Sequence, residues 1–120
     1  MSTKHFSDKE LSCKCGCGFK TTDSLFLDKL EIAREIAGIP FIITSAARCK
    51  EHNKAVGGVD TSAHTKGLAV DIAFKDSHSC YIILRSLYDA GFKRIGINFA
   101  KSFIHCDVDE SKPQDVLFKY

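Results

Sequence analysis

A histidine and an aspartate stand seven residues apart in the stretch SAHTKGLAVDIAF, residues 62–74. His64 belongs to a polar turn that contains glycine, whereas Asp71 lies between Val70 and Ile72 in an apolar run typical of a buried strand. Burying a carboxylate is costly unless a positive charge or a hydrogen bond compensates it. Two explanations are open from these residues: a metal ion bound by His64 and Asp71, or an arginine or backbone amide that pairs with Asp71.

A third residue type suited to metal binding occurs near the end of the chain. His105 lies in FIHCDVD, residues 103–109, which has the pattern of a strand with acidic neighbours. Catalytic zinc sites use three protein ligands and leave one position for water. His64, Asp71 and His105 would meet that requirement. The alternative is that His64 is a turn residue whose imidazole bonds a backbone carbonyl and His105 is a core residue with its hydrogen bonds satisfied.

The elements that must position these side chains follow from apolar periodicity and turn residues. Helical spacing predicts two amphipathic helices, over residues 22–37 and 77–90. Residues 45–58 read as a loop with room for a helical turn. Short β-branched runs predict strands over residues 39–44, 68–74, 94–100 and 102–109, the last two as a hairpin.

This order of elements lacks regular alternation of strand and helix. We therefore expect one α+β domain over residues 1–120, with a mostly antiparallel sheet and helices packed on one face. The apolar residues 116–118 near the end of the chain either add an edge strand or lie over the core.

Composition limits the possible partners. The chain is 44% hydrophobic and 27% charged, as expected for a globular protein, and its net charge of +2 is too small to indicate nucleic-acid binding. It contains neither an apolar run of membrane-spanning length nor a signal-peptide core near its start. We expect a monomer that does not engage membranes and is cytoplasmic as synthesised.

Six cysteines are many for 120 residues, and three of them, Cys13, Cys15 and Cys17, form the motif CKCGC. Without a signal sequence the thiols are expected to be reduced. The cluster is open to two interpretations, a separate metal site or small packed thiols. The isolated Cys49, Cys80 and Cys106 are expected to pack as small hydrophobic residues.

Several motifs together resemble one enzyme family. SAHTKGLAVD matches the pattern Ser-x-His-x-x-Gly-x-Ala-x-Asp of the zinc peptidases related to D-alanyl-D-alanine carboxypeptidases, the M15 family, whose fold is shared with the Hedgehog signalling domain. ITSAARCKEHNKAVGG is similar to the upstream segment of that family, and FIHCDVD to its closing His-x-Asp strand. FSDKELSCKCGCG resembles the leader of small single-domain members from phages and bacteria. The match in order and spacing runs over residues 42–109.

The resemblance implies a set of roles. His64, Asp71 and His105 would bind one Zn²⁺ ion, and Arg48 would hold or polarise the substrate. Ser62 would bind substrate or support the ligands, and His52 is expected to support the site as well.

The general base is where the sequence departs from the family pattern. Many members carry an acid three residues before the last zinc histidine, and Ser102 stands there in this chain. Asp107, two positions after His105 and therefore on the same face of a strand, is the predicted substitute. The alternative is that Asp107 orients a ligand or binds Arg48.

The resemblance predicts a zinc-dependent metallopeptidase that cleaves peptidoglycan stem or cross-link peptides, as a carboxypeptidase or an endopeptidase. An enzyme without a signal peptide would reach the wall after release, as a phage lysin does, or act on cytoplasmic precursors. The alternative function is a catalytically weak or inactive zinc-containing module that binds cell-wall peptide or a protein partner.

Overall fold

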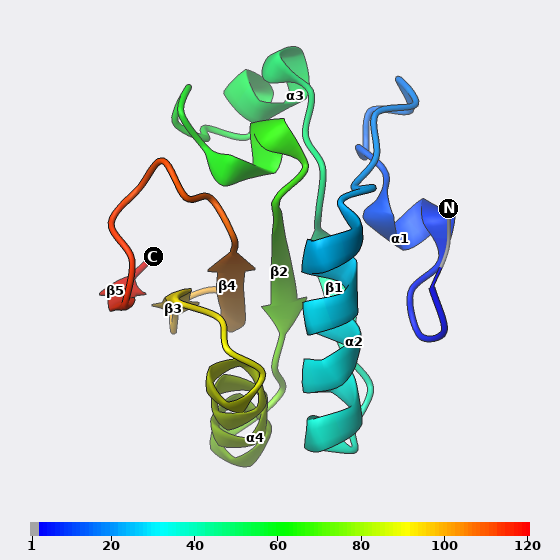
Figure 1. Cartoon of the computed structure of the whole chain (residues 1–120). Helices are drawn as coiled ribbons and strands as arrows, with labels where there is room; N and C mark the ends of the chain where they lie inside the picture. The colour runs from blue at the N-terminus through cyan, green and yellow to red at the C-terminus, as the bar shows by residue number, and fades with distance from the viewer. Residues whose placement is uncertain (1–2) are drawn as a thin grey trace.

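The structure, a computed structural model, describes residues 3–120 and has a five-stranded sheet at its centre (Figure 1). The strands lie across the sheet in the order β1-β2-β4-β3-β5, and every neighbouring pair is antiparallel except β3 and β5. The predicted α+β class with a mostly antiparallel sheet is confirmed. The strand bounds are β1 Ile42–Ser45, β2 Ala69–Ala73, β3 Arg94–Asn98, β4 Phe103–Asp107 and β5 Val116–Lys119.

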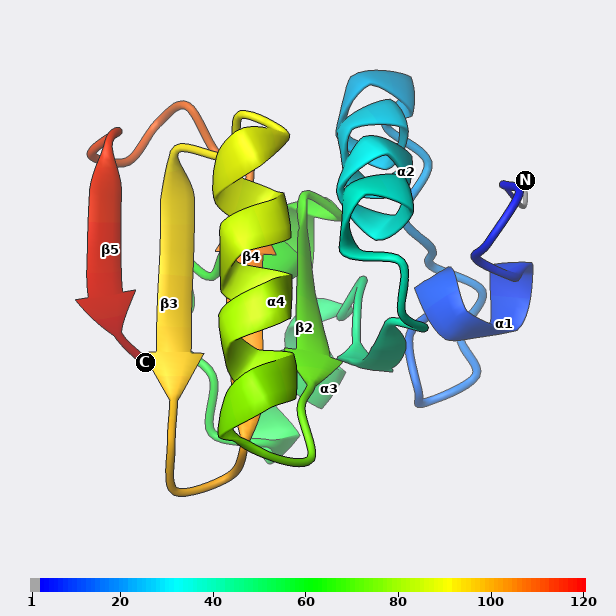
Figure 2. The ribbon, with the colours of Figure 1, turned by 90° about the horizontal axis from the view of Figure 1, so that it is seen from below.

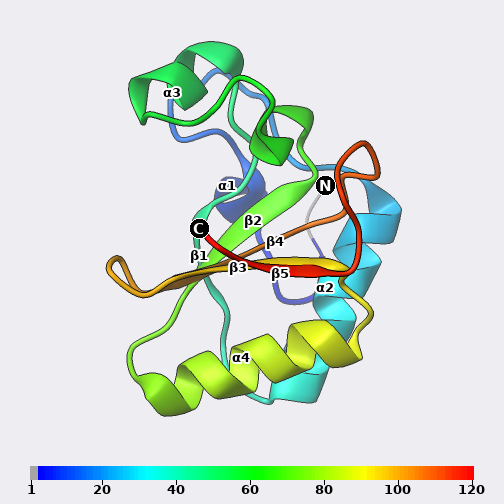
Figure 3. The same ribbon diagram turned by 90° about the vertical axis from the view of Figure 1, so that its left-hand side faces the viewer.

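The two long helices pack together on one face of this sheet, as Figures 2 and 3 show. The short helix α3 and the 3-10 helix η1 lie on the opposite side of the sheet, where the motifs singled out from the sequence fall (Figure 3). No helix within residues 3–120 has the length and apolar character needed to cross a membrane. The helices are α1 Asp8–Leu11, α2 Ser24–Ala37, α3 Lys50–Ala55, the 3-10 helix η1 Ala63–Lys66 and α4 Ser77–Asp89.

Local signals explain where the long helices begin and end. The carboxylate of Asp23 caps α2 by accepting a hydrogen bond from the Phe26 amide, and Gly38 ends the helix in the left-handed conformation. Asp76 caps α4 in the same manner. Both helices were predicted from periodicity, whereas α1 and η1 are too short for periodicity to reveal.

Alternation along the strands separates the core from the site. In β2, Val70 and Ile72 join the hydrophobic core under the helices, and Asp71 between them points to the other face. Strand β4 repeats the pattern, because Ile104 joins the core and His105 faces away from it. One face of the sheet is thus apolar, and the other carries the polar residues singled out from the sequence.

The end of the chain forms an edge strand, which was one of its two predicted alternatives. Strand β5 pairs in parallel with β3 and places Phe118 opposite Gly96. A Cβ atom on Gly96 would lie 2.5 Å from the Phe118 ring, so only glycine lets the ring lie this close to the sheet. The predicted hairpin is present as β3 and β4, and its turn contains Ser102 at a positive φ of 58°.

The isolated cysteines divide into two groups. Cys80 and Cys106 are buried in the core, as predicted for small hydrophobic residues. Cys49 differs from that prediction, because it is half-buried and lies beside the buried Cys13 and the exposed Cys15. The sequence gives no sign of this neighbourhood, since more than thirty positions separate the two segments.

Candidate metal centre and active site

Three donor side chains meet on the polar face of the sheet. Strands β2 and β4 place Asp71 directly opposite His105, and η1 brings His64 over the same point. One carboxylate oxygen of Asp71, Oδ1, lies 3.1 Å from His64 Nε2 and 3.0 Å from His105 Nδ1. The structure therefore brings together the three residues predicted to bind a metal ion.

The second nitrogen of each imidazole has its own partner. His64 Nδ1 donates a hydrogen bond of 2.6 Å to the backbone carbonyl of Ala46, and His105 Nε2 donates one of 2.7 Å to Asp107 Oδ2. Because these partners only accept hydrogen bonds, the protons of the neutral rings are fixed on those nitrogens. His64 Nε2 and His105 Nδ1 are left with lone pairs directed at Asp71.

This arrangement fits a divalent cation. Two imidazole lone pairs and an anionic oxygen converge with all three ligand atoms within 4.8 Å of one another, and such a group of acceptors repels itself unless a proton or a cation lies among them. Ligand atoms about 2.0–2.1 Å from a tetrahedral zinc ion lie about 3.3 Å apart, close to the spacings found here. Metal-binding histidines also typically donate their other N–H to a carbonyl or a carboxylate, as both do in this chain.

Electrostatics at the centre favour the anionic form of Asp71. Burial acts to raise its pKa, but the hydrogen bonds and positive charge that His105 and His64 supply when both rings are protonated outweigh burial and bring the pKa to about 2. At His105, burial acts to lower the pKa, and the contacts with Asp107 and Asp71 raise it overall. The centre carries net negative charge when both imidazoles are neutral, which suits a cation.

Asp107, predicted as the general base, is buried behind His105. Its Oδ2 atom accepts the His105 hydrogen bond, while its Oδ1 atom accepts one of 2.8 Å from Arg94 Nε and one of 3.0 Å from the Asp109 amide. These contacts hold the carboxylate against the ring nitrogen that faces away from Asp71. The sequence left two partners open for an Asp107 that does not act as the base, a ligand histidine or Arg48. The histidine is His105, and the arginine that binds Asp107 is Arg94 and not Arg48.

A cavity of about 490 Å³ opens beside the centre. Asp71 reaches its wall, so a substrate in the cavity would meet the centre from the Asp71 side. Arg48, Lys14 and Lys101 give the wall three cationic side chains. The cavity is also lined by Thr44, Ser45, His52, Val56, Gly57, Gly58, Asn98, Phe103 and Tyr120.

Arg48 is the cation held most firmly in this wall. The residue is only 7% exposed, its backbone amide donates a 2.9 Å hydrogen bond to the His64 carbonyl, and its Nε atom has no hydrogen-bond partner within residues 3–120. A buried N–H without a partner carries a desolvation cost, which a ligand would relieve. The structure places Arg48 in the wall of the cavity, and its role toward a substrate stays a prediction.

Ser62 and His52 occupy different places around the centre. Ser62 is buried and caps η1, because its hydroxyl accepts a 3.2 Å hydrogen bond from the His64 amide. It thus touches a ligand residue, as expected of a support. His52, in α3, is half-buried and lines the cavity itself.

Tyr120 is a residue of the site that the motifs did not reveal. Its ring lies 4.4 Å from the His105 ring between centroids and reaches the cavity, and it interacts with the side chain of Arg48. Burial raises the pKa of its phenol. The only sequence signal was the apolar tail, which predicted a strand but not its neighbour.

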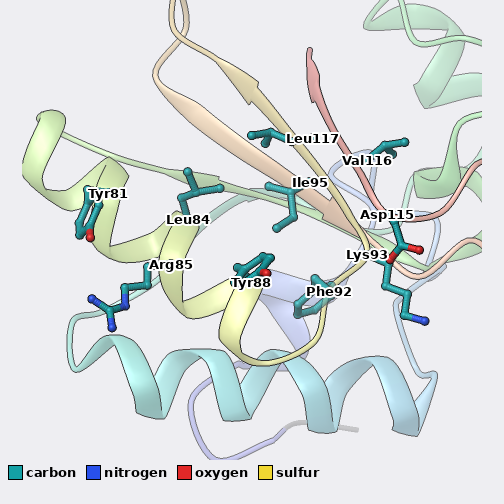
Figure 4. Close-up of a pocket in the computed structure, with 10 residues that line it drawn as sticks. All are labelled: Tyr81, Leu84, Arg85, Tyr88, Phe92, Lys93, Ile95, Asp115, Val116 and Leu117. Atoms are coloured by element: carbon teal, nitrogen blue, oxygen red, sulfur yellow. The ribbon is translucent and has the colours of Figure 1, made fainter.

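A second cavity, of about 520 Å³, lies on the helix side of the sheet (Figure 4). Figure 4 shows aromatic and aliphatic side chains from α4, β3 and β5 around it. Its charged residues are Arg85, Lys93 and Asp115, and none of the predicted metal ligands lines it. The two cavities are similar in volume, and the cavity beside His64, Asp71 and His105 is the candidate active site because of the residues that line it.

The sheet of this α+β fold brings two histidines and one aspartate together beside a cationic cavity. These side chains are the donor set of a metal-dependent hydrolase. Comparison with protein families identifies that class further. The family model described as peptidase M15 matches residues 4–107, and the chain belongs to this family. The M15 peptidases are metal-dependent, so membership indicates a metallopeptidase. A search of curated proteins found no match.

Proposed function

We propose that this protein is a zinc-dependent peptidase that cleaves stem or cross-link peptides of peptidoglycan. The observation that carries the proposal is the convergence of His64, Asp71 and His105 beside a cavity walled by Arg48. Two nitrogen donors and one oxygen donor are a ligand set that catalytic zinc uses. When bound, zinc lowers the pKa of a coordinated water toward neutrality and polarises the scissile carbonyl.

The cations of the cavity support a substrate that carries a carboxylate near the bond to be cut. Arg48 offers a partnerless Nε donor, and Lys14 and Lys101 add positive charge at the same wall. A guanidinium matches the geometry of a carboxylate with paired hydrogen bonds. Within this proposal, the free carboxylate of a stem peptide binds at Arg48, which favours the carboxypeptidase mode over the endopeptidase mode.

Proton transfer needs a group that reaches the cavity. Asp107 is held behind His105 by Arg94, so we assign it a positioning role in which it fixes the His105 tautomer. His52 and Tyr120 line the cavity and are the groups that we propose to move the proton toward the leaving amine.

A second function is favoured by one observation. Ser102 occupies the position where the family resemblance leads us to expect an acid, and Asp107 is occupied by Arg94 and His105. A chain with a complete ligand set but no acid at the expected place would bind cell-wall peptides without cutting them. Zinc binding is common to both functions, so only turnover separates them.

The deciding experiment is incubation of the zinc-loaded protein with defined linear and cross-linked muropeptides, followed by mass analysis of the products. We expect release of a terminal D-amino acid, loss of that release with a chelator, and recovery when Zn²⁺ is restored. The matched controls are His64→Ala, which removes a ligand, and His78→Ala, which removes an exposed histidine of α4. Saturable binding of the peptides without any product would support the binding module instead.

A further inference from the structure

Four thiols gather at a second point of the surface, away from the histidines. Cys13, Cys15 and Cys17 come from the motif CKCGC, and Cys49 comes from the residue just before α3. Figures 1 and 3 show the N-terminal segment passing beside α3. The Sγ atoms of Cys13 and Cys15 lie 3.4 Å apart, those of Cys15 and Cys49 lie 3.6 Å apart, and all four lie within 4.8 Å of one another.

These spacings match a tetrahedral thiolate site. With metal–sulfur bonds of about 2.3 Å, the sulfur atoms of such a site lie about 3.8 Å apart. A disulfide would require about 2.05 Å between two sulfurs and would account for only two of the four. The cluster thus has the size of a cage around one ion.

The surrounding backbone supports sulfur atoms that carry negative charge. The Cys49 amide donates to Cys13 Sγ at 3.4 Å, and the His52 amide donates to Cys49 Sγ at 3.3 Å. Hydrogen bonds from N–H groups favour the ionised form of their acceptor. The turn is closed by a hydrogen bond from the Gly16 amide to the Cys13 carbonyl, with Gly16 at a φ of 83°.

We propose that Cys13, Cys15, Cys17 and Cys49 bind a second metal ion, a structural zinc with four thiolate ligands. Soft thiolates in a tetrahedron select zinc over the harder divalent cations. The ion ties the CKCGC turn to the start of α3. Lys14 lies within that turn, and Arg48 precedes Cys49, so the thiolate centre fixes two of the three cations that line the catalytic cavity.

Metal analysis of the full chain, purified under reducing conditions with Zn²⁺ present, tests this proposal. We expect two zinc ions per chain in the wild type, one in Cys15→Ser/Cys49→Ser and one in His64→Ala/His105→Ala. The matched control Cys80→Ala, which alters a thiol in the core, should keep both ions. One zinc per wild-type chain, unchanged in the cysteine double variant, would overturn the proposal.

A measurement on the wild type guards against variants that fail to fold. Cys15 and Cys17 are exposed, so their alkylation should be slow in the zinc-loaded protein and become fast after chelation. Titration with Co²⁺ should add the sulfur-to-metal charge-transfer absorption that a nitrogen and oxygen site lacks. Equal alkylation rates with and without zinc, or an intact mass showing a disulfide among these cysteines, would contradict a thiolate centre. Neither readout depends on peptidase activity.

Discussion

The His64–Asp71–His105 centre and the four-cysteine cluster are two candidate metal sites built in opposite ways. In the first, two ligands sit opposite each other on paired strands, and all three side chains are buried. In the second, the donors lie on a surface turn and at the start of a short helix, and two of the thiols are exposed. The ladder of hydrogen bonds between β2 and β4 positions Asp71 and His105 independently of any ion. Under our proposal, the four thiols instead depend on an ion to hold the CKCGC turn to the start of α3.

Because one site is built on paired strands and the other on a turn, we expect them to respond differently to loss of metal. Positions fixed by a sheet stay in place when the ion leaves, because the cost of ordering them has already been met by folding. Loops that an ion joins regain their freedom when it leaves, since the binding free energy is part of their folding free energy. The following substitutions test this contrast, from the largest expected effect to the smallest.

Replacing His105 by alanine should abolish catalysis and remove one zinc ion while the thiolate centre keeps its own. The substitution deletes one of three ligands and also leaves Asp107 without its imidazole partner. Metal content, peptidase assay and thermal unfolding together measure the effect, with His78→Ala as the control. Full occupancy of both centres in His105→Ala would refute the ligand assignment.

Replacing Asp107 by asparagine should weaken zinc binding at the histidine centre by about 10–100-fold, the usual cost of losing a group that orients a metal ligand. The sulfur atoms of the cysteine cluster accept hydrogen bonds from the backbone amides of Cys49 and His52, whereas Asp107 contacts His105 of the other centre, so the zinc affinity of that cluster should not change. Competition with a chromophoric chelator measures both. Unchanged zinc affinity combined with loss of turnover would instead support Asp107 as the general base.

Replacing Arg48 by alanine should lower kcat/KM for substrates with a free carboxylate by about 10–100-fold, since hydrogen bonds to charged groups contribute about 1.5–3 kcal/mol. Zinc content should stay the same at both centres, because the contact of Arg48 with the His64 loop is made by its backbone amide. Arg85→Ala, at an exposed position of α4, is the matched control. An amidated substrate should be far less sensitive to Arg48→Ala, and equal sensitivity would argue against carboxylate binding.

Two glycine substitutions compare the regions without touching a ligand. Gly96→Ala should destabilise the protein by about 1–3 kcal/mol, because the new methyl group meets the Phe118 ring in a packed sheet. Gly16→Ala has open space around it, and its positive φ of 83° should cost about 1 kcal/mol. Chemical denaturation measures both. The reverse ranking would show that the turn, and not the sheet, is the more tightly held region.

The elements with strong periodic patterns were predictable and the short ones were not. The two long helices and the hairpin carry enough apolar residues for their spacing to identify them, as Phe26 and Leu30 do in α2. Segment η1 spans four residues, so its conformation follows from its cap, Ser62, and from tertiary contacts. Tyr120, which follows β5 and lies against His105, was not predicted because the parallel pairing of β3 with β5 has no local signature.

The sequence by itself identified the candidate metal ligands and their order along the chain, because the spacing of its motifs matches that of the family. It also determined the two faces of the sheet, since strand alternation sends Asp71 and His105 to one side and Ile72 and Ile104 to the other. Only the tertiary structure decided which atoms meet: Asp107 with Arg94, Tyr120 with His105, and Cys49 with the CKCGC turn. Such contacts join residues distant in the chain, and they depend on strand order and loop path, which no local pattern specifies.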